Sequence, residues 1–276
     1  MKHNKEYFLI IGPARSGTTF IHNLLSNHPN VSILSDEISS NSVFFKKGVG
    51  LFTHGNHSEQ EEKTGVNRIF KTLCDLNSLN KNISASGSKI ALQYADQAER
   101  VVNVINQNLN DFKIIIIKRD DLVAQYGSFL KSNLTGQSHS NLNIKTFIPL
   151  KKIKISRRYF RKYLQHQLWI IKYLDELKNN HNCIEINYEK EILNFNIETK
   201  KKIFSFLNIP IIEDIDSNLK KINSLPENYI INYSELSSFM QNYIKNYVLN
   251  KKPKKPMKNW YLLYKSFLHR KFKFFY

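Results

Sequence analysis

The chain has 276 residues, of which 41% are hydrophobic and 23% charged, so it can bury a core and is not globally disordered. Two cysteines are too few for the disulfide framework of a small secreted protein. The net charge of +18 favours anionic partners such as nucleotides, nucleic acid, acidic glycans or a membrane surface, without choosing among them.

Two patterns of apolar residues alternate along the chain. Short runs bounded by turn residues predict buried parallel strands, and i, i+3, i+4 spacings predict helices. In chain order, we expect a strand at 7–11, a helix at 18–26, a strand at 31–34, a long loop or lid at 39–65, a strand at 89–92, a helix at 97–108, a strand at 113–118, a helix at 121–131, an irregular segment at 135–155, a helix at 157–178, a strand at 183–187 and a helix at 200–207. Asp121 is expected to cap its helix and Asn208 to end the last one. This alternation predicts a three-layer α/β fold with a central, mostly parallel sheet.

The C-terminal end differs in composition from the rest. From about Lys251 it becomes basic and aromatic, so we expect one domain over 1–250 and a tail over 251–276. No recognised nucleic-acid-binding pattern accompanies these cations, so an anionic acceptor or peripheral contact with a membrane surface is expected instead. No apolar run is longer than five residues, far short of the ~20 residues that a membrane-spanning helix needs, and a cytoplasmic protein is expected. The sequence does not indicate an oligomeric state.

The segment 12–19, between the first strand and the first helix, has the composition of an anion-binding loop. Such a loop directs free backbone N–H groups and the positive end of the helix dipole at one point. Gly12 and Gly17 permit a tight turn, and Arg15 adds a charged fork. Hydroxyl donors come from Ser16, Thr18 and Thr19. The segment nearly fits the nucleoside triphosphatase loop, but Thr18 stands where that loop requires lysine, so a shorter anion is favoured over ATP or GTP.

The segment 15–19, Arg-Ser-Gly-Thr-Thr, resembles the phosphosulfate loop of sulfotransferases that use 3′-phosphoadenylyl sulfate (PAPS). In that family a basic residue is followed by Ser/Thr-Gly-Thr/Ser-Thr/Ser, and every position matches. The resemblance implies a phosphate-loop fold and a PAPS donor, with no metal required. It also implies the donor-binding residues Arg15, Ser16, Gly17, Thr18 and Thr19, with Arg15 acting in catalysis as well. Phe20 then either stacks on the adenine or is a core aromatic residue.

A second motif resembles the family's site for the donor's 3′-phosphate, an arginine after a later strand and a serine on the next helix. Here the strand at 113–118 runs into Arg119, and Ser128 lies on the next expected helix. The spacing, 128 − 119, is nine, whereas eight is usual in the family, so the turn is expected to hold one extra residue. Lys89 stands where family members often have a lysine before Thr-Pro. The Thr-Pro is absent, and the resemblance implies transition-state stabilisation by Lys89.

The resemblance also implies a base that takes a proton from the acceptor. Family members that act on small phenols use histidine, and many that act on sugars use glutamate. Glu37 follows Arg15 by 37 − 15, or 22, residues and returns to the same carboxyl edge of the sheet. The segment around it resembles the region before the catalytic glutamate of nodulation-type sulfotransferases. Asp36 is the alternative base.

Together these motifs predict a PAPS-dependent sulfotransferase, similar to bacterial, nodulation-type and carbohydrate members of the family. The expected acceptor is a hydroxyl, or secondarily an amine, of a sugar or glycan. One alternative is a small-molecule kinase or nucleotide hydrolase with the same sheet and loop. The other is a non-catalytic, basic anion-binding protein.

Overall fold

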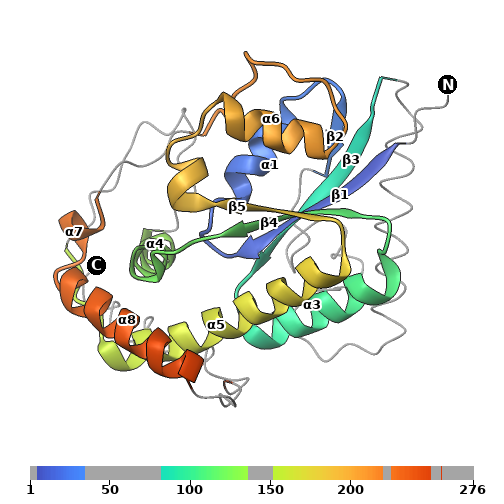
Figure 1. The fold of residues 1–276 in the computed structure, drawn as a ribbon. Coiled ribbons are helices and arrows are strands. Elements are labelled where there is room, and N and C mark those ends of the chain that lie inside the picture. Colours follow the sequence, from blue (N-terminus) through green and yellow to red (C-terminus); the bar gives the residue numbers. More distant parts are fainter. Residues whose placement is uncertain (1–4, 35–81, 136–151, 220–224, 250–255, 257–276) are drawn as a thin grey trace.

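Within the part of the chain that the structure describes, five strands form one parallel sheet (Figure 1). The structure is a computed structural model and describes residues 5–34, 82–135, 152–219, 225–249 and 256. The strands are β1 (Glu6–Pro13), β2 (Val31–Ile33), β3 (Ala85–Leu92), β4 (Lys113–Lys118) and β5 (Cys183–Asn187). Their order across the sheet is β2-β3-β1-β4-β5, and each neighbouring pair is parallel. The carboxyl ends of all five therefore lie at one edge.

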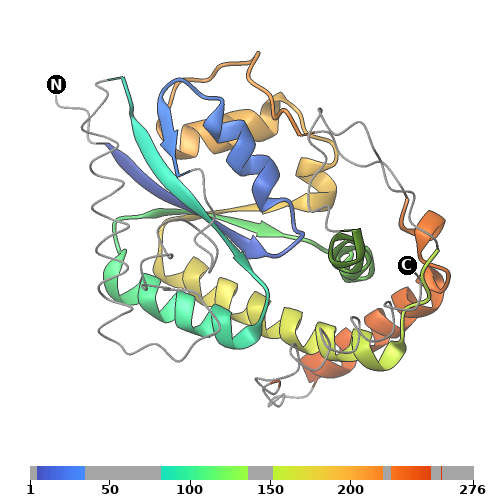
Figure 2. The same cartoon turned by 180° about the vertical axis from the view of Figure 1, so that it is seen from behind.

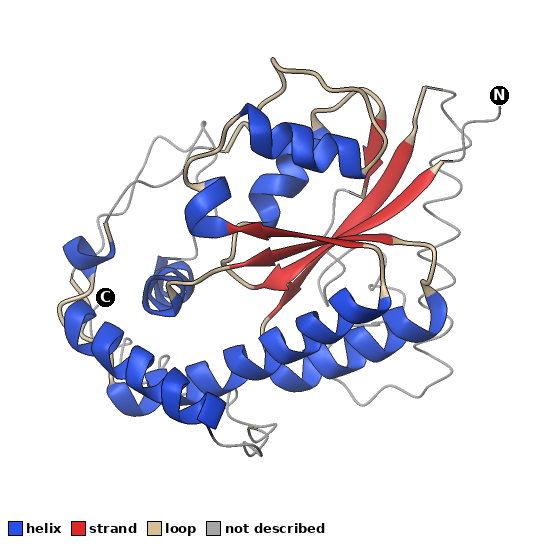
Figure 3. Cartoon of the chain, in the orientation of Figure 1, coloured by secondary structure: helices blue, strands red, loops and turns tan. Residues whose placement is uncertain are grey.

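Helices cover both faces of the sheet, and others lie beyond the carboxyl ends of the strands. The helices are α1 (Thr18–Ser26), α3 (Ala95–Asn108), α4 (Leu122–Thr135), α5 (Arg157–Asn180), the π-helix η1 (Tyr188–Ile192), α6 (Ile197–Phe206), α7 (Pro226–Tyr229) and α8 (Tyr233–Leu249). Figure 2 and Figure 3 show α1 and α6 on one face and α3 and α5 on the other. The same views place α4, α7 and α8 on the side to which the strands point. The predicted three-layer α/β fold is confirmed.

The middle residues of β1 and β4 are apolar and buried because helices cover both faces of these strands. One face of the pair packs against α3 and α5 through Leu9, Ile11, Ile114 and Ile116. The other packs against α1 and α6 through Phe8, Ile10, Ile115 and Ile117. Each of these side chains is at most 1% exposed, and burying one stabilises the fold by roughly 1.5–3 kcal/mol. β1 and β4 are thus a firm support for the loops that follow them.

A third apolar cluster fixes the helices beyond the strand ends. The C-terminal half of α5 packs on the sheet through Ile170 and Leu174. Its N-terminal half carries Phe160 and Leu164 into a separate cluster with Tyr126 of α4 and with α8. One long helix therefore joins the sheet to α4, which supplies side chains to the strand ends.

Every strand and helix predicted from the sequence is present. Two predicted helix boundaries are confirmed in atomic detail. Asp121 Oδ1 accepts a hydrogen bond from the N–H of Ala124 at 2.8 Å and so caps α4. Asn208 has a φ of 52°, and its N–H donates to the carbonyl of Ser205 at 3.1 Å, which ends α6.

Other boundaries differ from the prediction, and three helices were not predicted. α6 begins at Ile197 instead of residue 200, because Asn196 Oδ1 accepts a hydrogen bond from the N–H of Thr199 at 3.0 Å. The unpredicted helices are η1, α7 and α8. The expected loop at 39–65, most of the segment at 135–155 and the boundary between domain and tail lie outside the described residues. Among those that are described, no helix has the length and hydropathy to cross a membrane.

Candidate active site

The strand order brings three sequence-predicted cations to one place. β1 lies between β3 and β4, so the loop after β1 has Lys89 on one side and Arg119 on the other. Lys89 is paired with Ile10 in the register of β3 against β1. Arg119 follows the last residue of β4 directly. The loop containing Arg15 therefore lies at the centre of the carboxyl edge, as predicted.

The backbone of this loop has the shape of an anion-binding nest. Arg15 has a φ of 68° and Gly17 a φ of 98°, and such left-handed residues between ordinary ones turn successive N–H groups toward one point. A Cβ at Gly17 would also lie 2.8 Å from Tyr188 and Ile192 side-chain atoms, so only glycine fits. No side chain of the described residues caps α1. The first N–H groups of α1 are thus oriented for an anionic ligand.

Hydroxyl groups and one buried ammonium surround the same loop. Ser16 Oγ is fully buried and has no hydrogen-bond partner among the described residues, which an anion in the nest would supply. Lys89 Nζ donates to Thr19 Oγ1 at 2.8 Å, and Lys89 is only 4% exposed. Thr18 is buried in the first turn of α1. Lys89, placed here only by resemblance, therefore lies at the loop.

Helix α4 is joined to the loop through two side chains. Arg15 Nε donates to Ser128 Oγ at 3.1 Å. Gln125 Nε2 donates to the carbonyl of Ala14 at 2.7 Å. Ser128 thus reaches the site despite the longer spacing from Arg119. The sequence analysis did not identify Gln125, although it lies three residues before Ser128 and so on the same face of α4.

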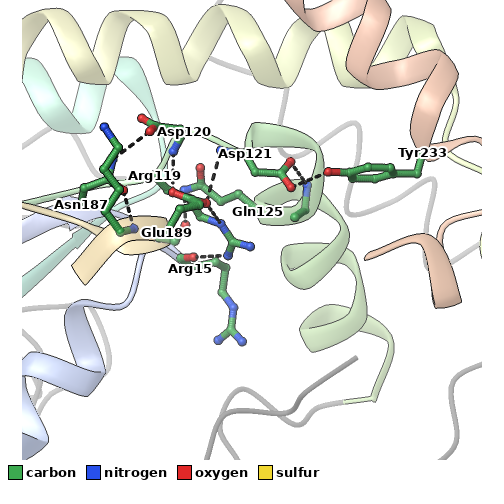
Figure 4. Close-up of polar contacts among 11 residues, drawn as sticks. Arg15, Arg119, Asp120, Asp121, Gln125, Asn187, Glu189 and Tyr233 are labelled. Atoms are coloured by element: carbon green, nitrogen blue, oxygen red, sulfur yellow. Dashed lines mark hydrogen bonds and ion pairs between the residues drawn. The ribbon is translucent and has the colours of Figure 1, made fainter. Parts of the chain in front are cut away.

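Three contacts hold the guanidinium of Arg119, and Figure 4 shows those with Arg15 and Glu189. Its Nη1 donates to the carbonyl of Arg15 at 3.0 Å. Its Nε lies 3.3 Å from Glu189 Oε1 in an ion pair that lacks hydrogen-bond geometry. Its Cζ lies 4.3 Å from the centre of the Tyr188 ring, a cation–π distance. Arg119 therefore braces the loop that contains Arg15.

The turn between β4 and α4 is tied to β5 and α8 (Figure 4). Glu189 accepts hydrogen bonds from the N–H groups of Asp120, at 2.9 Å, and Asp121, at 3.3 Å. Asn187 Nδ2 donates to Asp120 Oδ2 at 2.9 Å, and Tyr233 OH donates to Asp121 Oδ2 at 2.6 Å. No role was predicted for these residues, because the network joins segments that lie far apart in the chain.

The site is electrostatically positive. Burial lowers the pKa of Lys131 on α4, and the positive charge of Arg15 lowers it further. Burial raises the pKa of the Tyr163 phenol, while the charges of Arg119 and Arg15 act in the opposite direction. Both groups respond to the same concentrated positive charge, which favours a multiply charged anion.

The remaining candidates divide into those outside and those inside the described residues. Glu37 and Asp36, the expected base and its alternative, lie outside them. Phe20 lies inside them, is partly buried and packs edge-on against Phe195 with ring centres 4.9 Å apart, beside the core cluster that joins α1 and α6 to the sheet. Stacking of Phe20 on the adenine stays a prediction.

Known proteins resemble this chain in sequence and in fold. The sequence model of the sulfotransferase family matches residues 8–214. A sulfotransferase from Alicyclobacillus acidocaldarius is structurally similar with a TM-score of 0.50 and 15% identity, over 88% of this chain and 93% of that chain. The sulfotransferase domain of the Synechococcus PCC 7002 olefin synthase has a TM-score of 0.45 and 12% identity, over 99% and 97% of the two chains. No curated protein matches the chain at a significant level. The first structural similarity supports the three-layer fold.

Proposed function

This chain belongs to the sulfotransferase family, and from that premise we propose that it transfers a sulfuryl group from PAPS to a hydroxyl of a sugar or glycan. One observation carries the choice of donor: Arg15, Lys89 and Arg119 meet around the uncapped N-terminus of α1. A helix N-terminus alone suits one phosphate. Three adjacent cations suit a ligand with several negative charges.

The donor has two anionic parts, and the site offers a set of residues for each. The nest, Ser16, Thr18, Thr19 and the side chains of Arg15 and Lys89 would bind the 5′-phosphosulfate. Arg119 and Ser128 would bind the 3′-phosphate. The buried, unpartnered Ser16 Oγ supports the first assignment. Arg15 donates to Ser128, and Arg119 donates to the carbonyl of Arg15. These contacts support placing the 3′-phosphate residues beside the 5′-phosphosulfate residues.

In sulfuryl transfer, the bond between the sulfur and the donor's phosphate oxygen breaks, and a bond between the sulfur and the acceptor oxygen forms. The acceptor hydroxyl loses its proton. Negative charge then grows on the leaving phosphate oxygen, and fixed cations stabilise it without reorganising. Lys89 is suited to this role, because its ammonium is buried beside the nest where charges interact strongly. The proposal requires no metal ion.

We propose Glu37 as the base that accepts the proton of the acceptor hydroxyl, with Asp36 as the alternative. Many members of the family that act on sugars use a glutamate in this role. The net charge of +18 supports an acidic or long glycan. A cytoplasmic location, with peripheral membrane contact through 251–276, completes the proposal.

The experiment is a transfer assay with sulfur-labelled PAPS and a chelator, offered to a panel of glycans, lipid-linked sugars and phenols. We expect labelled product from a sugar-containing acceptor. Loss of that product in Glu37→Gln, with retention in Asp36→Asn, would identify the base. Transfer to phenols alone would contradict the sugar assignment, and absence of transfer to every acceptor would contradict the activity.

A further inference from the structure

Glu189 occupies a central position among the residues that surround the proposed 3′-phosphate site. It lies on η1, immediately after β5, and faces the turn that follows β4. One oxygen accepts from the N–H of Asp120, and the other accepts from the N–H of Asp121 and pairs with Arg119. A single carboxylate therefore fixes the backbone of the turn and the side chain of Arg119 together.

This turn is where the sequence predicts the extra residue in the spacing between Arg119 and Ser128. Two consecutive N–H groups point at Glu189, so the turn has one defined shape. The next residue, Asp121, caps α4 through the N–H of Ala124. Glu189 thus sets where α4 begins, and α4 carries Ser128.

The same carboxylate determines which way Arg119 points. Glu189 stands beside Nε, the carbonyl of Arg15 accepts from Nη1, and Tyr188 covers the ring-stacking face of the guanidinium. Nη2 has no hydrogen bond to any of the described residues. The contacts therefore leave Nη2 available to donate a charge-assisted hydrogen bond to an anion such as a phosphate.

We propose that Glu189 is a positioning residue that holds Arg119 in place for the donor's 3′-phosphate, an inference that rests on the proposed function. Glu189 acts through Arg119 and does not itself touch the ligand. Its own charge is balanced by two backbone N–H groups and one guanidinium. Removing the Glu189 carboxylate should therefore weaken phosphate binding by loosening Arg119. This effect should exceed the gain from removing the repulsion between the carboxylate and the 3′-phosphate.

The test compares two ligands that differ only by the 3′-phosphate, adenosine 3′,5′-bisphosphate and adenosine 5′-phosphate. Glu189→Gln should lower the preference for the bisphosphate about tenfold, the scale of losing one charge-assisted hydrogen bond between Arg119 and the 3′-phosphate. It should leave the affinity for adenosine 5′-phosphate unchanged. A residue that merely stabilised the fold would weaken both ligands together.

Glu191→Gln is the matched control. Glu191 lies on the same π-helix and accepts from the N–H of Asn187 at 2.6 Å, but it pairs with Lys202 on α6. Its variant should keep the wild-type preference. Glu189→Asp, which keeps the charge but shortens the reach, should also lose preference, and thermal melting of each variant checks that it is folded.

A second background separates the possible outcomes. In Arg119→Ala, adding Glu189→Gln should change the preference no further, because the residue through which Glu189 acts is gone. Two results would overturn the positioning role of Glu189. One is an unchanged or increased preference for the bisphosphate in both Glu189 variants, and the other is an equal loss of that preference in Glu191→Gln. A wild-type protein with no preference for the bisphosphate would overturn the proposed function itself.

Discussion

Arg15 combines three features that rarely occur in one residue. Its φ of 68° shapes the nest, its carbonyl accepts from Arg119, and its side chain donates to Ser128. Arg15→Ala should lower kcat by ~10²–10³, the loss typical of one transition-state donor. Steady-state kinetics with labelled PAPS checks this. Arg100→Ala, which removes an ion pair on the surface of α3, should remain near wild type, and near wild-type turnover in Arg15→Ala would refute the role of Arg15.

Lys89 differs from Arg15 and Arg119 because its side chain is buried, and its ammonium donates to Thr19 Oγ1 in the first turn of α1. Lys89→Met keeps the aliphatic stem and removes the charge. We expect kcat to fall about 10²-fold with a smaller change in KM. The ammonium stabilises the negative charge that grows on the leaving oxygen only in the transition state.

Lys113→Met is the control for this variant, since Lys113 is also largely buried but pairs with Glu6 at the opposite edge of the sheet. It should not affect kcat. A rise in KM with unchanged kcat in Lys89→Met would assign Lys89 to ground-state binding alone.

At the scale of elements, the sequence predicts best where a local pattern and the burial agree. The four isoleucines of β4 predict a buried strand, and the glycines and hydroxyls of 12–19 predict the nest. α8 was missed although Leu236, Met240 and Tyr243 recur with helical spacing and pack on α4 and α5. The long-range contacts of Gln125 and Glu189 have no local pattern, so no reasoning from one segment could assign them.

Helices α3 and α5 are joined by a histidine whose charge state matters. His166 Nδ1 accepts from the N–H of Ala95 at 3.3 Å in the first turn of α3, and burial lowers its pKa to about 4. The unfolded chain binds a proton near the ordinary pKa of 6.5, whereas the folded protein does not until about 4. Stability is therefore lost as the pH falls between these values, by about 2 kcal/mol from about pH 7 to about pH 5.

Urea unfolding at these two pH values measures this loss. His166→Asn keeps an acceptor near the N–H of Ala95 but cannot be protonated. Between about pH 7 and about pH 5, the free energy of unfolding of this variant should therefore fall by about 2 kcal/mol less than that of the wild type. An identical pH dependence in the variant would show that His166 is not the group that titrates.

In the whole molecule, positive charge also lies away from the loop after β1. Arg158 and Arg161 are exposed near the start of α5, where the helix dipole does not favour cations. We expect such residues and the tail to serve the acceptor or a membrane surface. Deleting 251–276 should leave donor affinity unchanged within about twofold, a difference well below 1.4 kcal/mol. Calorimetric titration of the truncated chain checks this, and loss of donor binding would place the tail in the fold.

We expect the loop after β1 and Arg119 together to bind a 3′-phosphorylated adenine nucleotide without a metal. Titration of adenosine 3′,5′-bisphosphate in the presence of a chelator measures this binding, with magnesium and ATP as the comparison. We predict tight binding of the bisphosphate without metal, lost in Arg119→Ala. Magnesium-dependent binding of ATP, with no binding of the bisphosphate, would contradict the proposed PAPS site and favour a kinase or nucleotide hydrolase.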